Sequence, residues 1–334
     1  SRHHEDILLQ KAGHCDLVET PEREWYAVHL CGRASERRNP PDAPRFAGCR
    51  RYMLGRETAI QKMRWTQDGW LELDADCVPE GRTTSFSNTP LERVSAPACA
   101  ADNTPEACGG PDNAGPVGEA PFYRDDFDSP SLALDYQSLR IPMDSHYLSL
   151  TERPGWLRMY GRSGLSSRFS QTLIARRMTE YHMTSEACVS FEPEVFKQMA
   201  GLILMYDTDN YLYLHLSRDE DVGKCITLLK AENRSYEYLT DYIPLEEGRD
   251  VILSLSINGT SVQFFYGYRD ACRDASAADV LIPAGGAVDA SFLSDEACRE
   301  GWFTGTMIGI CCQDLTGFGK HADFDWFEVR PEGS

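Results

Sequence analysis

The sequence is poor in positive charge and has no long hydrophobic run. Lysine and arginine together number 33, against 52 aspartate and glutamate residues, and the formal net charge is −19. Binding to nucleic acid or to an anionic membrane needs clustered positive charge, so we expect neither partner. The longest apolar runs, such as GLILMY at 201–206, are far shorter than the ~20 residues of a membrane span. An acidic surface is compatible with a neutral ligand such as a sugar.

The chain also lacks the spacing of a disulfide or metal framework. Its 12 cysteines include no C-x-x-C pair, and Cys311 and Cys312 are adjacent in an apolar run. We expect most of them to be buried small hydrophobic residues; a few disulfides in a secreted protein are the alternative. No charged segment followed by an apolar run opens the chain, so no signal peptide is recognised. The compartment, cytoplasmic or secreted, stays unknown.

Helical periodicity is missing from every long window, and short β-rich runs take its place. Turn signals such as DTDN, INGT and LTGFG separate these runs, which predicts an all-β sandwich or barrel. One short helix is expected at FLSDEACREG, residues 292–301. The runs expected to be strands include WYAVHL, LGRETAIQKMRW, LILMY, YLYLHL, CITLLKA, VILSLSI, SVQFFYGY, FTGTMIGICCQ and DFDWFEVR.

A change in composition divides the chain. The stretch from Val94 to Pro121 is rich in Ala, Pro, Gly and Asn, which predicts domains at 1–96 and 122–331 joined by a linker at 97–121. The first domain offers four strand-like runs, CDLVET, WYAVHL, GRETAIQKMRW and GWLEL, interrupted by a basic, proline-containing loop from Gly32 to Arg51. Four antiparallel strands amount to one propeller blade, and a single blade leaves both faces unburied.

Several spaced motifs carry a family resemblance. The stretches AGHCDLVET…EWYAVHLCGR and LGRETAIQKMRWTQDGWLEL resemble the last blade of the five-bladed propeller of glycoside hydrolase family 43, in its β-xylosidase branch. YRDDFDSPSLALDYQSLRIP, GLILMYDTDNYLYLHL and FTGTMIGICCQDLTGFGKHADFDWFEV resemble the concanavalin A-like sandwich of that branch. The resemblance implies an N-terminally truncated member: a single-blade remnant of the propeller followed by a two-sheet β-sandwich.

The resemblance also implies a chemistry that this chain does not complete. Enzymes of the family invert the anomeric centre, which needs one carboxylic acid for the leaving oxygen and one carboxylate to activate water. The family holds these groups in NPDPS-like and EGP-like stretches, and neither occurs here, so we expect no catalytic residue in this chain. The complete enzyme would act on xylo-oligosaccharides or arabinosyl substrates, and homo-oligomers are compatible with this reading. The alternative is a lectin-like, non-catalytic carbohydrate-binding sandwich.

Three residues match substrate-contacting positions of the family. His14, in AGH, matches a histidine at the floor of the sugar site, where imidazole bonds water or a cation. Arg56, in LGRETA, matches an arginine that reaches the terminal sugar, whose paired hydroxyls suit its planar fork. Phe303, in GWFTG, falls where an aromatic walls the aglycone side. The alternatives are a polar residue at a strand start, an ion pair with Glu57, and an ordinary buried aromatic.

Two acidic stretches suggest a structural metal site. RDDFD and ADFDWF occupy the expected first and last strands of the sandwich, which often lie side by side. No cofactor is required, but Asp126, Asp128 and Asp323 could converge on Ca²⁺ through oxygen ligands. Solvated acids at a sheet edge are the alternative. The aromatic runs YLYLHL and FFYGY could form a sugar-stacking surface, although core packing is the favoured interpretation.

Overall fold

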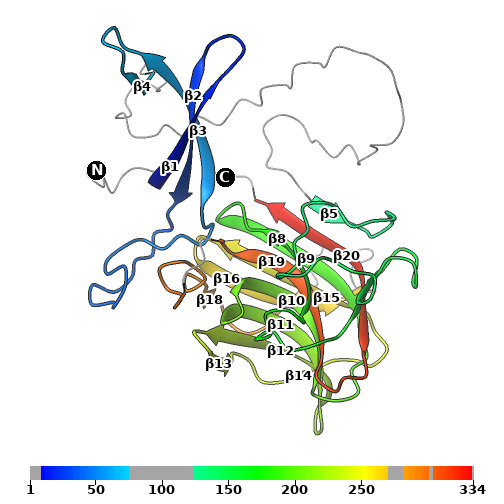
Figure 1. The fold of residues 1–334 in the computed structure, drawn as a ribbon. Helices are drawn as coiled ribbons and strands as arrows, with labels where there is room; N and C mark the ends of the chain where they lie inside the picture. Colours follow the sequence, from blue (N-terminus) through cyan, green and yellow to red (C-terminus); the bar gives the residue numbers. More distant parts are fainter. Residues whose placement is uncertain (1–8, 75–122, 270–280, 301–303, 333–334) are drawn as a thin grey trace, which may run out of the picture. The chain divides into compact units, whose positions relative to one another are not determined.

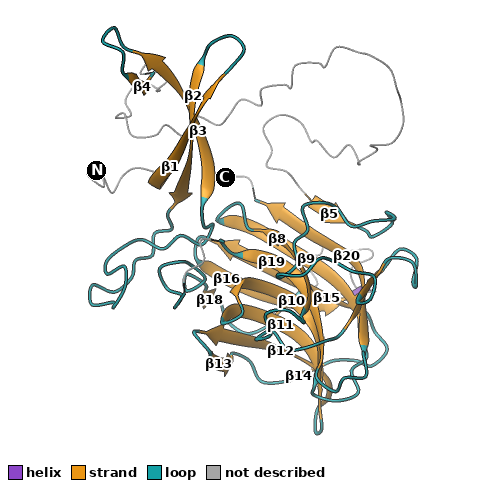
Figure 2. Ribbon diagram, viewed as in Figure 1, coloured by secondary structure: helices purple, strands orange, loops and turns teal. Residues whose placement is uncertain are grey.

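A computed structural model describes residues 9–74, 123–269, 281–300 and 304–332 (Figure 1). Strands joined by turns and loops account for nearly all of this part (Figure 2), which confirms the all-β prediction. The expected linker at 97–121 lies outside the described residues. Within the described part, no helix has the length and apolar character needed to cross a membrane.

Each run expected from the sequence contains a strand, and the turn signals fall between strands or at their ends. The strands are β1 (Leu9–Glu19), β2 (Trp25–Arg33), β3 (Glu57–Trp65), β4 (Leu71–Leu73), β5 (Tyr123–Asp125), β6 (Leu148–Ser149), β7 (Leu157–Tyr160), β8 (Thr172–Arg177), β9 (His182–Ser190), β10 (Gln198–Asp207), β11 (Asn210–Asp219), β12 (Gly223–Glu232), β13 (Ser235–Tyr238), β14 (Ile243–Pro244), β15 (Val251–Asn258), β16 (Ser261–Tyr268), β17 (Ile282–Pro283), β18 (Val288–Asp289), β19 (Met307–Asp314) and β20 (His321–Pro331).

The described residues form two compact units. The first contains residues 9–34 and 56–74, and the second contains residues 35–55 together with the described residues from 123 onward. The loop that interrupts the first unit in the sequence therefore belongs to the second unit in space. This division differs from the predicted one, in which the loop was part of the N-terminal domain.

The first unit is one antiparallel sheet in the order β1-β2-β3-β4. Its four strands are the four runs expected from the sequence. On β1, Leu17 and Val18 remain 48% and 46% exposed. Because successive side chains of a strand point to opposite faces, apolar surface is exposed on both faces of this sheet. Trp65 and Trp70 add further exposed apolar surface on β3 and the turn that follows it.

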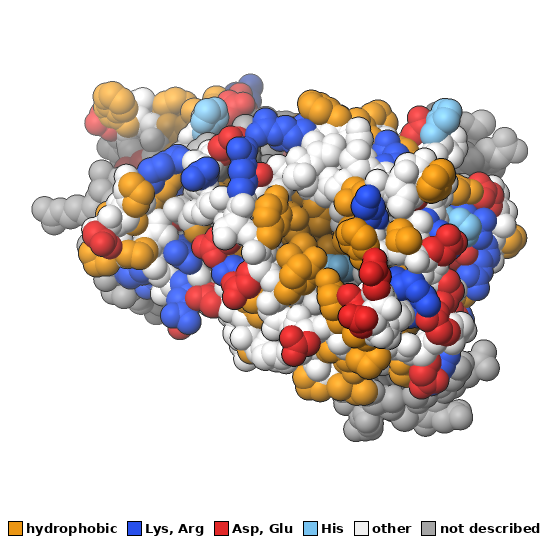
Figure 3. Space-filling model, turned by 90° about the horizontal axis from the view of Figure 1, so that it is seen from below, with side chains coloured by type: hydrophobic (Ala, Val, Ile, Leu, Met, Phe, Trp, Pro, Cys, Tyr) orange, Lys and Arg blue, Asp and Glu red, His pale blue; other side chains and the backbone are white. Residues whose placement is uncertain are grey.

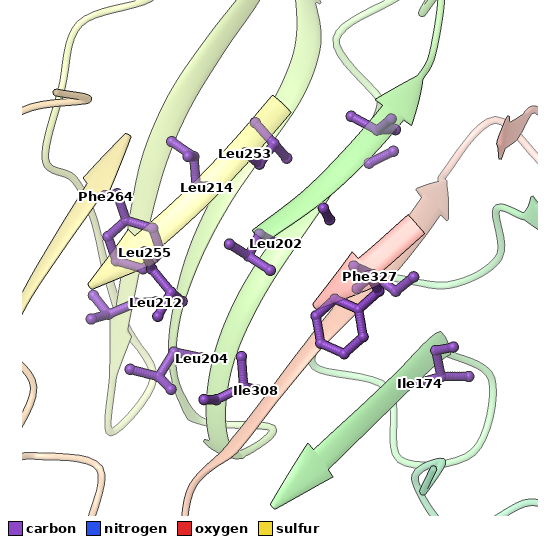
Figure 4. Packing of buried hydrophobic residues seen from close by; sticks show 14 of the residues in the cluster. Ile174, Leu202, Leu204, Leu212, Leu214, Leu253, Leu255, Phe264, Ile308 and Phe327 are labelled. Atoms are coloured by element: carbon purple, nitrogen blue, oxygen red, sulfur yellow. The ribbon is translucent and has the colours of Figure 1, made fainter. Parts of the chain in front are cut away.

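The second unit packs two antiparallel sheets face to face. One has the order β13-β12-β11-β10-β19-β8 and the other β17-β16-β15-β9-β20-β7-β6. Their facing side chains form the main hydrophobic cluster, in which leucines from β10 and β11 meet Leu253 and Leu255 of β15, Phe264 of β16 and Phe327 of β20 (Figure 4). Burial of these side chains removes a large apolar surface from water and is the dominant stabilising term.

The alternation of β11 separates two hydrophobic clusters. Leu212 and Leu214 belong to the main cluster, whereas Tyr211 and Tyr213 belong to a second cluster on the other face of the same sheet. Both tyrosines are buried. Core packing, the favoured interpretation of YLYLHL, therefore accounts for them, although half of that core lies outside the sandwich interior.

The short helix expected at 292–301 is wrong. Residues 292–300 form turns, and residue 301 lies outside the described part. A helix would bond the Glu296 carbonyl to an amide four residues on, but here that carbonyl accepts the Asn39 side-chain amide at 2.8 Å. The Glu296 carboxylate accepts the Tyr52 backbone N–H at 2.9 Å, so this acidic residue is used as a buried acceptor.

Most described cysteines are small buried hydrophobic residues, as the sequence predicted. Six of the eight described cysteines are buried: Cys31, Cys188, Cys225, Cys298, Cys311 and Cys312. Burial raises the pKa of the Cys311 thiol to about 12, so it stays protonated at neutral pH and is a poor nucleophile or metal ligand.

Two facing carboxylates generate the first prediction. Glu186 on β9 lies opposite Glu328 on β20. Glu328 pairs with Arg124 and Arg330, whereas burial raises the pKa of Glu186 and the Glu328 charge raises it further. The folded protein thus binds this proton more tightly than the unfolded chain does, so stability falls as pH rises above about 4.5.

We expect Glu186→Gln to increase the free energy of unfolding by ~0.5 kcal/mol at neutral pH, because a facing like charge is removed. The gain should fade as the pH falls well below 4.5, where Glu186 becomes protonated in both states. Urea unfolding across this pH range measures it, with the exposed Glu220→Gln as the control. A variant that gains stability only at acidic pH would contradict the assignment.

Candidate functional site

His14 lies in an irregular part of β1. The pairing of β1 with β2 shifts register on both sides of Gly13, between Gln10 and Gly13 and between Gly13 and Asp16. His14 has a left-handed backbone with φ of 57°, and its side chain is exposed. Bulges often redirect a side chain beside a functional site, and a non-glycine residue with positive φ is an informative outlier. This geometry is compatible with the role predicted for His14, which stays a prediction.

Arg56 immediately precedes β3 and is half-buried. The next residue, Glu57, binds Arg33 of β2 in a bidentate pair, with Nε and Nη2 of the guanidinium 3.0 and 2.8 Å from the two carboxylate oxygens. Glu57 thus stabilises the pairing of β2 with β3. The sugar contact predicted for Arg56 stays a prediction.

His14 and Arg56 lie near the same cross-strand row of the four-stranded sheet. Gly13 of β1 faces Leu30 of β2, and Leu30 faces Thr58 of β3. His14 follows Gly13 by one residue and Arg56 precedes Thr58 by two, so the two candidates lie on opposite sides of this row. A shared role in binding one sugar stays a prediction.

Phe303 cannot be placed in this arrangement because it lies outside the described residues. Its predicted role beside the aglycone stays a prediction.

The aspartates expected to bind calcium are engaged elsewhere. β5 pairs with β20, as expected for the first and last strands of a sandwich. However, Asp126 pairs with Arg124 at 2.8 Å and is exposed, as is Asp128. In the described part of the chain, no group of three or more His, Cys, Asp or Glu side chains is arranged to hold a metal ion. No contact in the described structure brings the three aspartates together, and the calcium site stays a prediction.

Asp323 is the buried centre of an arginine network. Its side chain is 7% exposed and receives Nε and Nη2 of Arg158 at 2.7 and 2.9 Å and Nη1 of Arg153 at 3.1 Å. Burial alone would raise the pKa of this carboxyl, but the hydrogen bonds from Arg158 and Arg153 outweigh it and lower the pKa. Both oxygens are thus satisfied by guanidinium groups that repel a cation.

The surface of the protein is hollowed in places. Figure 3 shows one on the face seen from below, with hydrophobic side chains inside it and acidic side chains along part of its rim. A polar hollow of about 260 Å³ is lined by Lys230, Glu232, Asn233, Ser235 and Glu237. Its cation already contacts a carboxylate, since Lys230 Nζ lies 2.6 Å from Glu232. Such a hollow can hold a small polar molecule but offers no pair of free acid and base.

Sequence reasoning missed one set of polar residues altogether. Asn39 and Arg51, from the basic loop, form a buried network with Ser291 and Glu296 of the second unit. The sequence marks this segment as a basic, proline-containing loop in a chain of strongly negative charge. It does not indicate where that loop packs.

Comparisons with known proteins cover nearly the whole chain. The family model for the β-xylosidase C-terminal concanavalin A-like domain matches residues 124–330, and that for glycosyl hydrolases family 43 matches residues 1–71. A β-xylosidase of Bacillus subtilis is 33% identical over 334 residues, which cover 96% of this chain and 54% of that protein. Xylosidase/arabinosidase 43B of Humicola insolens is 33% identical over 340 residues, which cover 99% and 54%.

A solved structure matches this chain over a similar share of both proteins. The xylan β-1,4-xylosidase of Bacillus halodurans superposes with a TM-score of 0.76 at 36% identity, over 98% of this chain and 55% of that one. The chain therefore spans about half the length of the relatives it matches.

The Asp323 network gives the second prediction. We expect Asp323→Asn to lower the free energy of unfolding by about 3 kcal/mol at neutral pH, because the half-buried Arg158 loses its buried counter-charge. The lowered pKa of Asp323 contributes stability that is present above pH ~4 and is lost as the pH falls further. Acid unfolding should accordingly be less steep in the variant. Thermal and urea unfolding at several pH values measure both effects.

The exposed Asp126→Asn is the matched control and should change stability little. The same melts with and without calcium test the metal site. An increase in melting temperature on adding calcium that disappears in Asp323→Asn would establish the metal site and contradict a purely arginine-bound Asp323.

Proposed function

Because this chain belongs to glycoside hydrolase family 43, we propose that it forms the C-terminal portion of a β-xylosidase or α-L-arabinofuranosidase. The complete enzyme would hydrolyse the O-glycosidic bonds of xylo-oligosaccharides with inversion. Its sandwich would support the last propeller blade rather than carry out chemistry itself.

The observation that carries this proposal is the exposed apolar surface on both faces of the four-stranded sheet. Leu17 and Val18 face opposite sides and are each about half exposed, and Trp70 is 73% exposed. A lone four-stranded sheet with two uncovered apolar faces is poorly stabilised. Neighbouring blades of a propeller would cover both faces, since radial packing of blades is how that fold buries its sheets.

The residues of this chain would bind substrate without cleaving it. Inverting hydrolysis needs two carboxyl groups on opposite faces of the sugar. His14 and Arg56 supply neither an acid nor a base of that kind. In the complete enzyme, His14 would bond a sugar hydroxyl or a water, and Arg56 would hold paired hydroxyls and steady a nearby carboxylate.

The substrate class follows from relatives rather than from contacts. The relative in Bacillus subtilis is named a β-xylosidase, and that in Humicola insolens a xylosidase/arabinosidase. We accordingly propose a terminal xylose or arabinose as the sugar bound. The strongly acidic composition fits a neutral oligosaccharide better than a polyanion.

This proposal predicts that the 334-residue chain alone does not hydrolyse an aryl β-xyloside or an aryl α-L-arabinofuranoside, because acid and base are both missing. The absorbance of the released aryl alcohol measures hydrolysis, and the Bacillus subtilis relative is the positive control. Turnover by the purified chain that is lost in a Glu or Asp variant would place a catalytic carboxylate in this chain and overturn the division of roles.

A second candidate, a carbohydrate-binding sandwich, is favoured by an exposed tyrosine cluster. Tyr236 and Tyr238 lie on edge strand β13 and are 52% and 56% exposed. The ring centroids of Tyr238 and Tyr242 are 6.0 Å apart. Residues two apart on a strand share a face. The pairing continues this row inward, from Tyr236 to Ala231 and Tyr211. Tyrosine rings offer an apolar face and a hydroxyl, which suits a sugar.

If this candidate holds, titration calorimetry of the chain with xylo-oligosaccharides should show binding that Tyr236→Ala and Tyr238→Ala each weaken by about tenfold. The exposed Phe318→Ala, on the turn between β19 and β20, is the control for loss of an aromatic side chain. If no heat of binding is measured, or if both tyrosine variants bind as tightly as the wild type, binding at this surface is rejected.

A further inference from the structure

The basic loop of the sequence connects the two units by a second route. Residues 35–55, here called the clasp, leave the first unit after β2 and return to it at β3, yet they pack in the second unit. The clasp holds five arginines against Glu36 and Asp42, in a chain of net charge −19. Its connection to the second unit does not involve residues 97–121.

Backbone hydrogen bonds within the clasp fold it on itself. The Ser35 N–H donates to the Arg51 carbonyl, the Arg51 N–H to the Arg37 carbonyl, and the Asn39 N–H to the Cys49 carbonyl, each at 2.9 Å. These bonds close the segment into a hairpin. A pre-ordered segment loses less conformational entropy on docking than a free loop does.

A buried polar network attaches this hairpin. Arg51 donates to Ser291 Oγ at 2.7 Å and to Asn39 Oδ1 at 2.8 Å. Asn39 in turn donates to the Glu296 carbonyl at 2.8 Å, and the Glu296 carboxylate accepts the Tyr52 N–H at 2.9 Å. Asn39, Ser291 and Glu296 are at most 5% exposed, so any broken bond would leave an unsatisfied buried group.

The end of the clasp is part of the sandwich core. Met53 and Leu54 are fully buried members of the main hydrophobic cluster. The Met53 carbonyl accepts the Thr306 N–H at 2.7 Å. Gly55 and Gly305 both have positive φ, and a Cβ on Gly55 would lie 2.4 Å from the Gly305 nitrogen. The backbones meet so closely that only glycine fits at this contact.

From this attachment we propose that the clasp surface of the sandwich, formed by residues 289–300 and 304–306 around Ser291 and Glu296, is a docking site for the clasp, which is covalently continuous with β2 and β3 of the first unit. The clasp tethers that unit to the sandwich without a covalent connection through residues 97–121. A chain cut between 97 and 121 stays assembled. The inference concerns assembly and does not depend on the proposed glycosidase activity.

The test cuts the full chain at one new place. A protease recognition sequence inserted between residues 97 and 121 is cleaved in the purified protein, and a denaturing gel verifies the cut. We expect the two pieces to co-elute on size exclusion. In the double variant Asn39→Ala/Arg51→Ala, which loses the polar anchors, we expect association to weaken at least about tenfold, so that the pieces separate on dilution.

Both changed residues lie outside 123–332, and an unchanged melting transition of the sandwich piece shows that its own fold is intact. Arg37→Ala is the matched control, because its pair with Asp289 at 3.4 Å is largely exposed and contributes little. Separation of the cut wild-type pieces overturns the proposal. Co-elution that is equally strong in the double variant overturns it too, because a surface other than the clasp would then hold the pieces.

Discussion

Mutual burial of two leucine-rich sheet faces is the interaction on which the second unit depends. Leu202 and Leu204 of β10 and Leu212 and Leu214 of β11 point into the space between the sheets, where Phe264 and Phe327 meet them. The same alternation sends Tyr211 and Tyr213 to the other face, where a smaller cluster forms. One period-two pattern thus builds the core and fixes which aromatic side chains lie outside it.

The clasp extends that core with residues from another part of the chain. Met53 and Leu54 join the main cluster, so the sandwich is complete only with a segment that lies between two strands of the first unit in the sequence. Asn39 and Arg51 then satisfy buried polar groups that the sandwich presents at Ser291 and Glu296. Among the described residues of the first unit, no hydrophobic cluster of comparable burial forms.

Local patterns explain what the sequence predicted, and long-range contacts explain what it did not. Strands and turns such as β10, β11 and their DTDN connection were predictable because alternation and turn chemistry are local signals. The helix expected at 292–301 was wrong because the Glu296 carbonyl bonds Asn39, which lies 257 residues away in the chain. The Asp–Phe alternation placed Asp323 on β20, but no spacing indicated that Arg153 and Arg158 bind it. The positive φ of His14 has no signal in composition either.

The buried end of the clasp restricts the backbone at Arg56. The clasp ends at Gly55, whose contact with Gly305 leaves no freedom for a side chain, and Arg56 is the next residue. Fixing Met53 and Leu54 in the core therefore restricts the backbone from which Arg56 emerges. A residue that binds sugar hydroxyls gains most when its backbone is ordered before substrate arrives, because less entropy is then lost on binding. In the proposed enzyme, the clasp would thus order the backbone just before β3, where Arg56 lies.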